Sequence, residues 1–183
     1  MIHRETYREL LVFVFLVALG VVGRSLDHAW NFTPLTAITA LGAFTFRSWA
    51  PAVLLPVTVL AASDLFLPAH DNWPVLVAVY AMALVPLALG RAARGAAGWR
   101  RAACWGLCGF VPATAFFLVT NFAVWASKSL YAASFSGLMD CYAKALPFYR
   151  AMLAGDLCYI ALVAGGLAMA SALQIAPADR REA

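Results

Sequence analysis

A polar and aromatic cluster, Asp27-His28-Ala29-Trp30-Asn31-Phe32-Thr33-Pro34, lies between the first two apolar runs of the chain, directly after Arg24. It places a carboxylate, an imidazole, an indole and an amide within a few residues of one another. A few such groups in otherwise apolar surroundings are what orients a small ligand in a pocket. The cluster is therefore predicted to form one wall of a binding site.

Further polar and aromatic side chains recur near the ends of later apolar runs. Ionisable groups at such depth either pair with one another and position helices, or contact a polar ligand, and both interpretations stay open. The expected ligand-binding residues are Arg24, Asp27, His28, Trp30, Asn31, Asp64, His70, Asn121, Trp125, Tyr142, Arg150 and Asp156.

Metal and thiol chemistry were considered next. His28 and His70 favour a metal or a metal-containing ligand, but neither H-x-x-x-H nor H-E-x-x-H spacing is present, which argues against a dedicated zinc site. Cys104 and Cys108, four residues apart, are interpreted as small packing residues. For Cys141 and Cys158, a disulfide and the ligation of a soft metal both remain open.

Nucleotide and nucleophile motifs are absent from the sequence: it contains no Walker A motif, no G-x-G-x-x-G and no Ser/His/Asp elbow. An ATPase that drives transport would therefore have to be a separate chain. This pattern favours a binding or passive component, with no intrinsic cofactor and no catalytic residues expected.

The elements that carry these residues are predicted to be membrane helices. The chain has 183 residues, of which 64% are hydrophobic and 12% charged, and its mean hydropathy is +0.81. Apolar runs of about the length that spans a bilayer recur throughout, which predicts one all-α domain over residues 1–183, a bundle of six transmembrane helices. These lie at about residues 10–26, 34–46, 49–67, 74–90, 103–127 and 149–173, and the longest loop is expected between Lys128 and Pro147.

Orientation follows from the arginines. With both termini cytoplasmic, most of the basic residues fall on the inner side, as the positive-inside rule requires. These inner residues are Arg4, Arg8, Arg47, Arg91, Arg94, Arg100, Arg101, Arg180 and Arg181. The net charge of +4 is explained by this bias, so nucleic acid is not expected as a partner, and the candidate ligand-binding residues all fall on the outer side.

Five motifs resemble those of a family of small bacterial inner-membrane proteins that is similar to the substrate-binding S-components of energy-coupling-factor vitamin transporters. They are Asn31-Phe32-Thr33-Pro34, Ser63-Asp64-Leu65-Phe66-Leu67, Thr120-Asn121-Phe122-Ala123-Val124-Trp125, Cys141-Tyr142-Ala143-Lys144-Ala145-Leu146-Pro147-Phe148 and Gly155-Asp156-Leu157-Cys158-Tyr159. The resemblance extends from about Arg24 to Tyr159.

The resemblance implies an S-component-like six-helix fold that captures a vitamin at the outer face of the bacterial inner membrane and imports it. Its nearest members are the solitary cobalamin-uptake S-components, so cobalamin or a related corrinoid is the expected ligand, with His28 as a candidate axial ligand of its cobalt. The loop after the third span has His70 and no cysteine, unlike the thiol ligation known in that group.

The resemblance also implies binding partners, and alternative functions stay open. Besides the vitamin and the lipid bilayer, separate ATPase and coupling subunits are expected, but the first helix offers Ala18, Gly20 and Gly23 in place of the Ala-x-x-x-Ala docking motif. The alternative functions are a membrane-embedded metal protein or enzyme with its site at the outer face, and a non-transporting subunit whose outer loops bind another protein.

Overall fold

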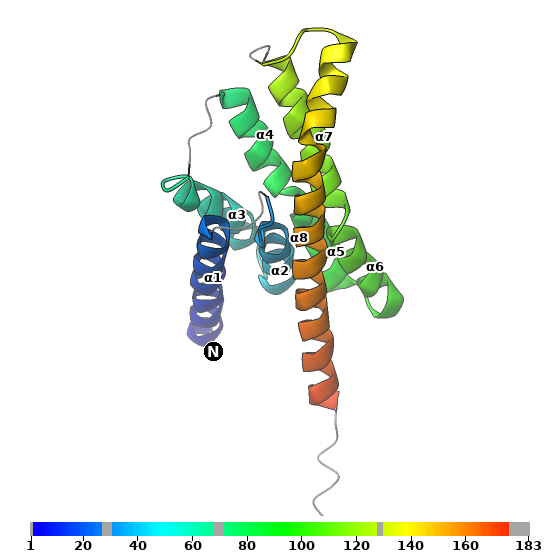
Figure 1. Ribbon diagram of the computed structural model, residues 1–183. Helices are drawn as coiled ribbons and strands as arrows, with labels where there is room; N and C mark the ends of the chain where they lie inside the picture. Colours follow the sequence, from blue (N-terminus) through cyan, green and yellow to red (C-terminus); the bar gives the residue numbers. More distant parts are fainter. Residues whose placement is uncertain (1, 27–30, 68–71, 128–129, 176–183) are drawn as a thin grey trace, which may run out of the picture.

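Every regular element in the described part of the chain is an α-helix. The computed structural model describes residues 2–26, 31–67, 72–127 and 130–175. The helices are α1 (Ile2–Ser25), α2 (Leu35–Thr45), α3 (Trp49–Ser63), α4 (Trp73–Ala83), α5 (Val85–Gly95), α6 (Gly98–Cys108), α7 (Val111–Ala126) and α8 (Phe135–Ile175). The prediction of an all-α protein is confirmed for these residues (Figure 1).

Four helical stretches in the described residues are long and apolar enough to cross a membrane: Glu5–Ser25, Trp73–Gly95, Gly98–Ala126 and Phe135–Leu173. This supports the membrane assignment. By contrast, α2 and α3 have 11 and 15 residues, fewer than the roughly 20 that span a hydrocarbon core. A crossing by all six segments and the cytoplasmic location of both termini therefore stay predictions.

Prolines divide two of the long stretches into pairs of helices. α4 and α5 meet at Leu84, two residues before Pro86, and α6 and α7 meet at Gly109 and Phe110, two residues before Pro112. A proline has no amide hydrogen and its ring crowds the carbonyl four residues earlier, so the helix is interrupted there. Each break lies within one predicted span, residues 74–90 and 103–127, and the prediction did not include either break.

The short helix α2 is the centre of the packing. Seven of its 11 residues are buried, which is the pattern of a helix surrounded by others. Its tightest neighbour is α5, because a Cβ at Gly90 would overlap the carbonyl oxygen of Ala40. Phe46, fully buried just after α2, and Leu55 and Val59 of α3 extend this core toward α1.

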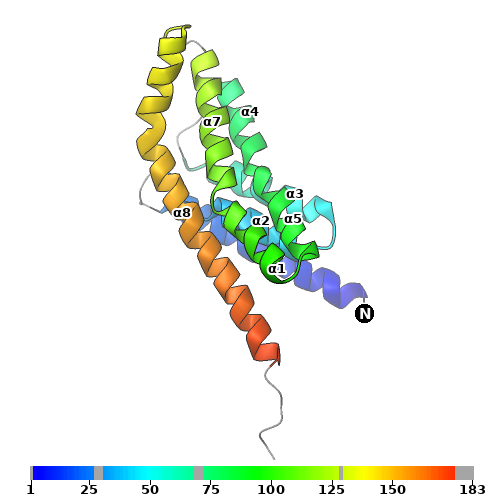
Figure 2. The ribbon, with the colours of Figure 1, turned by 90° about the vertical axis from the view of Figure 1, so that its right-hand side faces the viewer.

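The last helix corrects the predicted loop between Lys128 and Pro147. α8 begins at Phe135 and continues through Pro147 for 41 residues, so Cys141 and Lys144 are helical. The predicted start of the last helix at Tyr149 is therefore wrong, because a membrane helix tolerates an internal proline such as Pro147 when neighbours satisfy the freed carbonyl. α8 changes direction where its colour passes from yellow to orange (Figure 2).

The helices leave polar groups at two separate ends. α4, α7 and the first part of α8 stand together above α1, α2 and α3 in Figure 1, while α5, α6 and the rest of α8 lie lower. At the predicted inner end, Arg91 and Arg94 donate hydrogen bonds to backbone carbonyls at the C-terminal end of α2, including that of Phe46. Arg47 pairs there with Glu5, its Nη1 lying 2.6 Å from Oε2.

Candidate ligand-binding site

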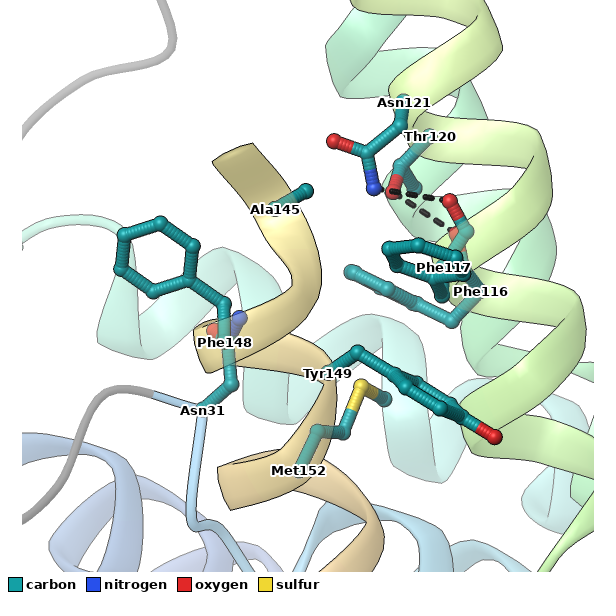
Figure 3. A pocket seen from close by; sticks show the side chains of 9 residues that line it. All are labelled: Asn31, Phe116, Phe117, Thr120, Asn121, Ala145, Phe148, Tyr149 and Met152. Atoms are coloured by element: carbon teal, nitrogen blue, oxygen red, sulfur yellow. Dashed lines mark hydrogen bonds between the residues drawn. The ribbon is translucent and has the colours of Figure 1, made fainter. Parts of the chain in front are cut away.

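A cavity of about 240 Å³ opens between α7 and α8 at the predicted outer side. Phe116 and Phe117 of α7 and Tyr149 and Met152 of α8 face one another across it, and Asn31 reaches it from the loop after α1 (Figure 3). The remaining lining residues are Thr120, Asn121, Ala145 and Phe148. Three segments far apart in the sequence therefore form this one site.

Helix periodicity places these side chains on one face of each helix. Residues 145, 148, 149 and 152 follow the spacing of three or four that aligns side chains along an α-helix, and residues 116, 117, 120 and 121 do the same on α7. The rings of Phe117 and Tyr149 lie 4.7 Å apart between centroids at an angle of 33°. The two rings are therefore in contact with each other and form one continuous aromatic wall of the cavity.

The polar groups of the cavity are partly used by their own helix. Asn121 donates through Nδ2 to the carbonyl oxygen of Phe117 at 2.7 Å, and Thr120 donates to that of Phe116 at 2.7 Å. The Asn121 Oδ1 atom is an additional acceptor, and the amide of Asn31 supplies both a donor and an acceptor. The site therefore offers neutral hydrogen-bonding groups beside an aromatic wall.

A smaller cavity of about 50 Å³ continues inward from the first. The two share Asn31, Phe116 and Met152, and the smaller one is also lined by Arg24 and Thr36. The residues shared by the two cavities therefore separate a molecule in the larger cavity from the Arg24 side chain.

Arg24 belongs to a polar cluster that joins three helices. Its Nε donates to the hydroxyl of Ser63 at 2.7 Å, and its Nη2 to Oδ1 of Asp64 at 3.1 Å. Tyr80 of α4 donates to Oδ2 of the same carboxylate at 3.2 Å. Because Asp64 neutralises Arg24, the cluster as a whole carries no net charge.

The loop motif Asn31-Phe32-Thr33-Pro34 is held by close packing on both sides. Gly23 of α1 faces Pro34, and a Cβ at Gly155 of α8 would lie 3.2 Å from the Cα of Phe32. The rings of Phe32 and Tyr159 lie 5.5 Å apart. Two of the five motifs noted in the sequence, residues 31–34 and 155–159, therefore form one contact.

Asn31 itself adopts a left-handed backbone conformation, with φ of 63°. Asparagine tolerates this region better than other residues with a Cβ atom. The conformation places its exposed side chain at the junction of the two cavities.

The comparisons with known proteins give a family and no activity. A family model described as a family of unknown function, DUF6580, matches residues 4–178. The chain belongs to DUF6580. No curated protein and no solved structure matches it. The DUF6580 match does not link the chain to S-components, so that resemblance stays a prediction. Any function has to be argued from the site.

Asp156 lies next to the inner cavity without lining it. Its side chain is 2% exposed, and the hydroxyl of Thr36 is its hydrogen-bond partner. Its Oδ2 atom has no partner among the described residues. Met152, one helical turn earlier, lines both cavities, and Thr36, the partner of the carboxyl, lines the smaller one.

Three of the predicted site residues lie elsewhere. The Trp125 indole donates to the carbonyl oxygen of Ala132 at 3.0 Å, and the Tyr142 hydroxyl to that of Leu118 at 2.8 Å, so both hold the α7–α8 hairpin together. Neither lines a cavity, and Arg150 is exposed. Asp27, His28, Trp30 and His70 lie outside the described residues, as does the predicted role of His28 as a cobalt ligand.

The positions of Cys141 and Cys158 exclude the predicted alternative of a disulfide between them. Cys141 and Cys158 are free and lie 17 residues apart on α8. A helix rises about 1.5 Å per residue, so their Cα atoms are about 25 Å apart, far beyond the reach of a disulfide. Cys141 is buried, and its thiol lies 3.4 Å from the backbone carbonyl oxygen of Asn121.

Aromatic lining residues were the part of the site that the sequence did not reveal. Phe116, Phe148 and Met152 were not among the expected residues. Phe116 and Met152 lie within predicted spans and resemble ordinary lipid-facing side chains, whereas Phe148 lies before Tyr149, where the last span was predicted to begin. Extending the 3.6-residue pattern back through Pro147 would have aligned Ala145 and Phe148 with them. Within the described residues, no group of three or more His, Cys, Asp or Glu side chains is placed to hold a metal.

Proposed function

We propose that this protein is a membrane binding protein that captures a small vitamin-type molecule at its outer side, as a step in import. The observation that supports this most directly is the pair of adjacent cavities, whose linings share Asn31, Phe116 and Met152. Concave, mostly aromatic sites with a few convergent polar groups are typical of small-molecule binding.

The chemistry of the walls favours a flat, largely uncharged ring system. Phe117 and Tyr149 provide aromatic faces, while Asn31 and Asn121 provide amide groups at its edge. Arg24 is already neutralised by Asp64, so the site has no uncompensated charge that would require an ionic ligand. A heteroaromatic ring with edge donors and acceptors meets these conditions.

Cobalamin remains the specific ligand that the S-component resemblance implies. A corrin ring with its nucleotide is larger than the drug-sized molecules that pockets of about 300–1,000 Å³ enclose, and the larger outer cavity measures about 240 Å³. A corrinoid would therefore have to widen the gap between α7 and α8, or be held mainly above it. A smaller heteroaromatic vitamin would require less widening than a corrinoid, which favours it as the ligand.

Binding can be tested by isothermal titration calorimetry on the purified protein in nanodiscs. Cyanocobalamin, riboflavin, thiamin and pyridoxine are titrated separately. We expect saturable binding of one of these, and a loss of about tenfold or more in Asn121→Ala, because removing a hydrogen-bonding partner in a dry site costs about 1–3 kcal/mol. Asp140→Asn, an exposed position on α8 away from the cavity, is the matched control.

The outcomes separate the alternatives. No heat with any of the four compounds, and no coloured cofactor in the purified protein, would remove the vitamin proposal. Equal affinity in wild type and Asn121→Ala would place the ligand outside this cavity. Binding that requires added metal would instead favour the metal-protein alternative.

A further inference from the structure

A second and larger cavity, of about 420 Å³, lies at the predicted inner end between α6 and α8. Its walls are the small side chains Ala164 and Ala168 of α8, together with the Trp105 ring of α6 and the Phe44 ring of α2. Gly98 and Arg101, in the first turn of α6, close one end of it. The cavity is therefore an apolar groove with a cation at its end.

Arg101 is held in place by contacts that leave most of its charge available. Its Nε donates to the carbonyl oxygen of Ala96 at 2.9 Å, and its guanidinium carbon lies 5.7 Å from the centre of the Phe44 ring. Neither contact neutralises it. The sequence from Arg91 to Cys108 contains four arginines and no acidic residue. Residues 157–175 of α8 contain no acidic residue either.

Three other arginines of this end have partners elsewhere in the chain, whereas Arg100 contacts the Trp99 ring of its own turn. Arg91 and Arg94 donate to carbonyl oxygens after α2, and Arg47 pairs with Glu5. Among the described residues, Arg24 and Arg47 are the arginines in ion pairs with carboxylates, so Arg101 has no such counter-charge. Among the described residues, no carboxylate therefore balances the positive charge at the rim of the groove.

The start of α6 adds to the positive field. Its first turn has no acidic residue and no side-chain cap, so its free backbone amides point out of the helix beside Arg101. The partial positive charge of a helix N-terminus favours an anion, and two arginines in the same turn are unfavourable without one. Anionic headgroups are bound in this way by basic pockets between membrane helices on the cytoplasmic side.

We propose that the groove between α6 and α8 binds one anionic phospholipid, whose acyl chain lies along Ala164 and Ala168 and whose phosphate is held by Arg101 and the first turn of α6. The apolar walls of the groove suit an acyl chain, and the Arg101 guanidinium suits a phosphate. Trp99 in the same turn is 76% exposed, and tryptophans are enriched where a membrane protein borders the lipid headgroups.

The test compares lipid binding by the intact protein in mild detergent, measured by native mass spectrometry. Phosphatidylglycerol is expected to bind at a stoichiometry of one, and phosphatidylcholine of the same chains to bind at least fivefold more weakly. Arg101→Gln should reduce phosphatidylglycerol binding by about fivefold. Arg100→Gln, which removes a charge from the same turn but not from the groove, should leave it unchanged.

A second variant tests the acyl part without changing any charge. Ala168→Leu fills the groove from an exposed helix position, so the fold should persist, and phosphatidylglycerol binding should fall as in Arg101→Gln. Thermal unfolding of each variant without added lipid checks that the fold is intact.

Several results would overturn the proposal. Equal losses in Arg100→Gln and Arg101→Gln would indicate a general surface charge effect. Full competition by glycerol phosphate would indicate a phosphate site that does not use the groove. A dimer that Ala168→Leu converts to monomer, with unchanged lipid binding, would assign the groove to a second copy of the chain.

Discussion

Arg24 and Asp64 lie 40 residues apart in sequence and 3.1 Å apart in space, where Nη2 of the first donates to Oδ1 of the second. Both side chains are mostly buried, with 16% and 21% exposure. Asp64→Ala should lower the free energy of unfolding by about 2 kcal/mol, less than the 3–5 kcal/mol of a fully buried pair. Thermal unfolding in detergent measures this. The exposed Arg47–Glu5 pair is the control, and Glu5→Ala should cost less than about 1 kcal/mol.

Asn31 combines a backbone role with a side-chain role, and two substitutions separate them. Asn31→Gly keeps the left-handed conformation without strain but removes the amide, so ligand affinity should fall while the melting temperature stays close to wild type. Asn31→Ala should also lose about 1 kcal/mol of stability, because alanine lacks the short polar side chain that lets asparagine tolerate a φ of 63°. An unchanged affinity in Asn31→Gly would show that the amide does not contact the ligand.

Thr36 and Asp156 should be energetically coupled. Thr36→Val removes the hydroxyl that partners the carboxyl, and an unsatisfied buried polar group costs about 1–3 kcal/mol. In an Asp156→Ala background the same substitution should cost clearly less, since the group that needed the hydroxyl is gone. A double-mutant cycle from denaturation measurements gives the coupling energy. Additive effects of the two substitutions would contradict a direct interaction.

Tyr142 is expected to stabilise the α7–α8 hairpin rather than to bind ligand. Tyr142→Phe removes the hydrogen bond to the Leu118 carbonyl and should cost about 1 kcal/mol, with ligand affinity within about twofold of wild type. Tyr131→Phe is a matched control, because its ring contact with Lys144 is retained. A large loss of affinity in Tyr142→Phe at unchanged stability would return Tyr142 to the ligand site.

Gly90 and Gly165 should respond in opposite ways to alanine. At Gly90 the new Cβ would overlap the Ala40 carbonyl, so α5 must move away from α2 at a cost of about 1–3 kcal/mol. At Gly165 nothing lies within 4 Å, and the higher helix propensity of alanine should stabilise α8 by about 0.5–1 kcal/mol. Chemical denaturation of both variants provides the comparison. A neutral Gly90→Ala would mean that α2 and α5 are not in close contact.

Composition and apolar length were sufficient to predict the helical class and the membrane setting, because both depend on averages over many residues. The boundaries of residues 34–46 were predicted to within one residue of α2, since Pro34 and Arg47 mark its two ends. The helix breaks at Leu84 and Gly109 were not predicted. Apolar periodicity continues through them, and only the geometry of Pro86 and Pro112 interrupts the backbone.

The site was predicted in part for a related reason. Polar residues stand out in an apolar sequence, so Arg24, Asn31 and Asn121 were identified as site residues, and all three line the cavities. Aromatic lining residues such as Phe116 resemble ordinary lipid-facing residues in sequence, and tertiary packing alone assigns them to a cavity. Conversely, Tyr142 is of a residue type common in binding sites, but its hydroxyl donates a hydrogen bond to the Leu118 carbonyl.

The hydrogen bonds from Arg91 and Arg94 to the end of α2 bear on how the protein is assembled in the bilayer. An 11-residue helix is a weak signal for the insertion machinery, and the arginines that satisfy its terminal carbonyls are synthesised more than 40 residues later. In the predicted orientation, those arginines would retain their loop on the cytoplasmic side while the chain emerges. α2 can therefore reach its final position only after α5 has been delivered to the membrane, which makes its docking a late, post-insertional step of biogenesis.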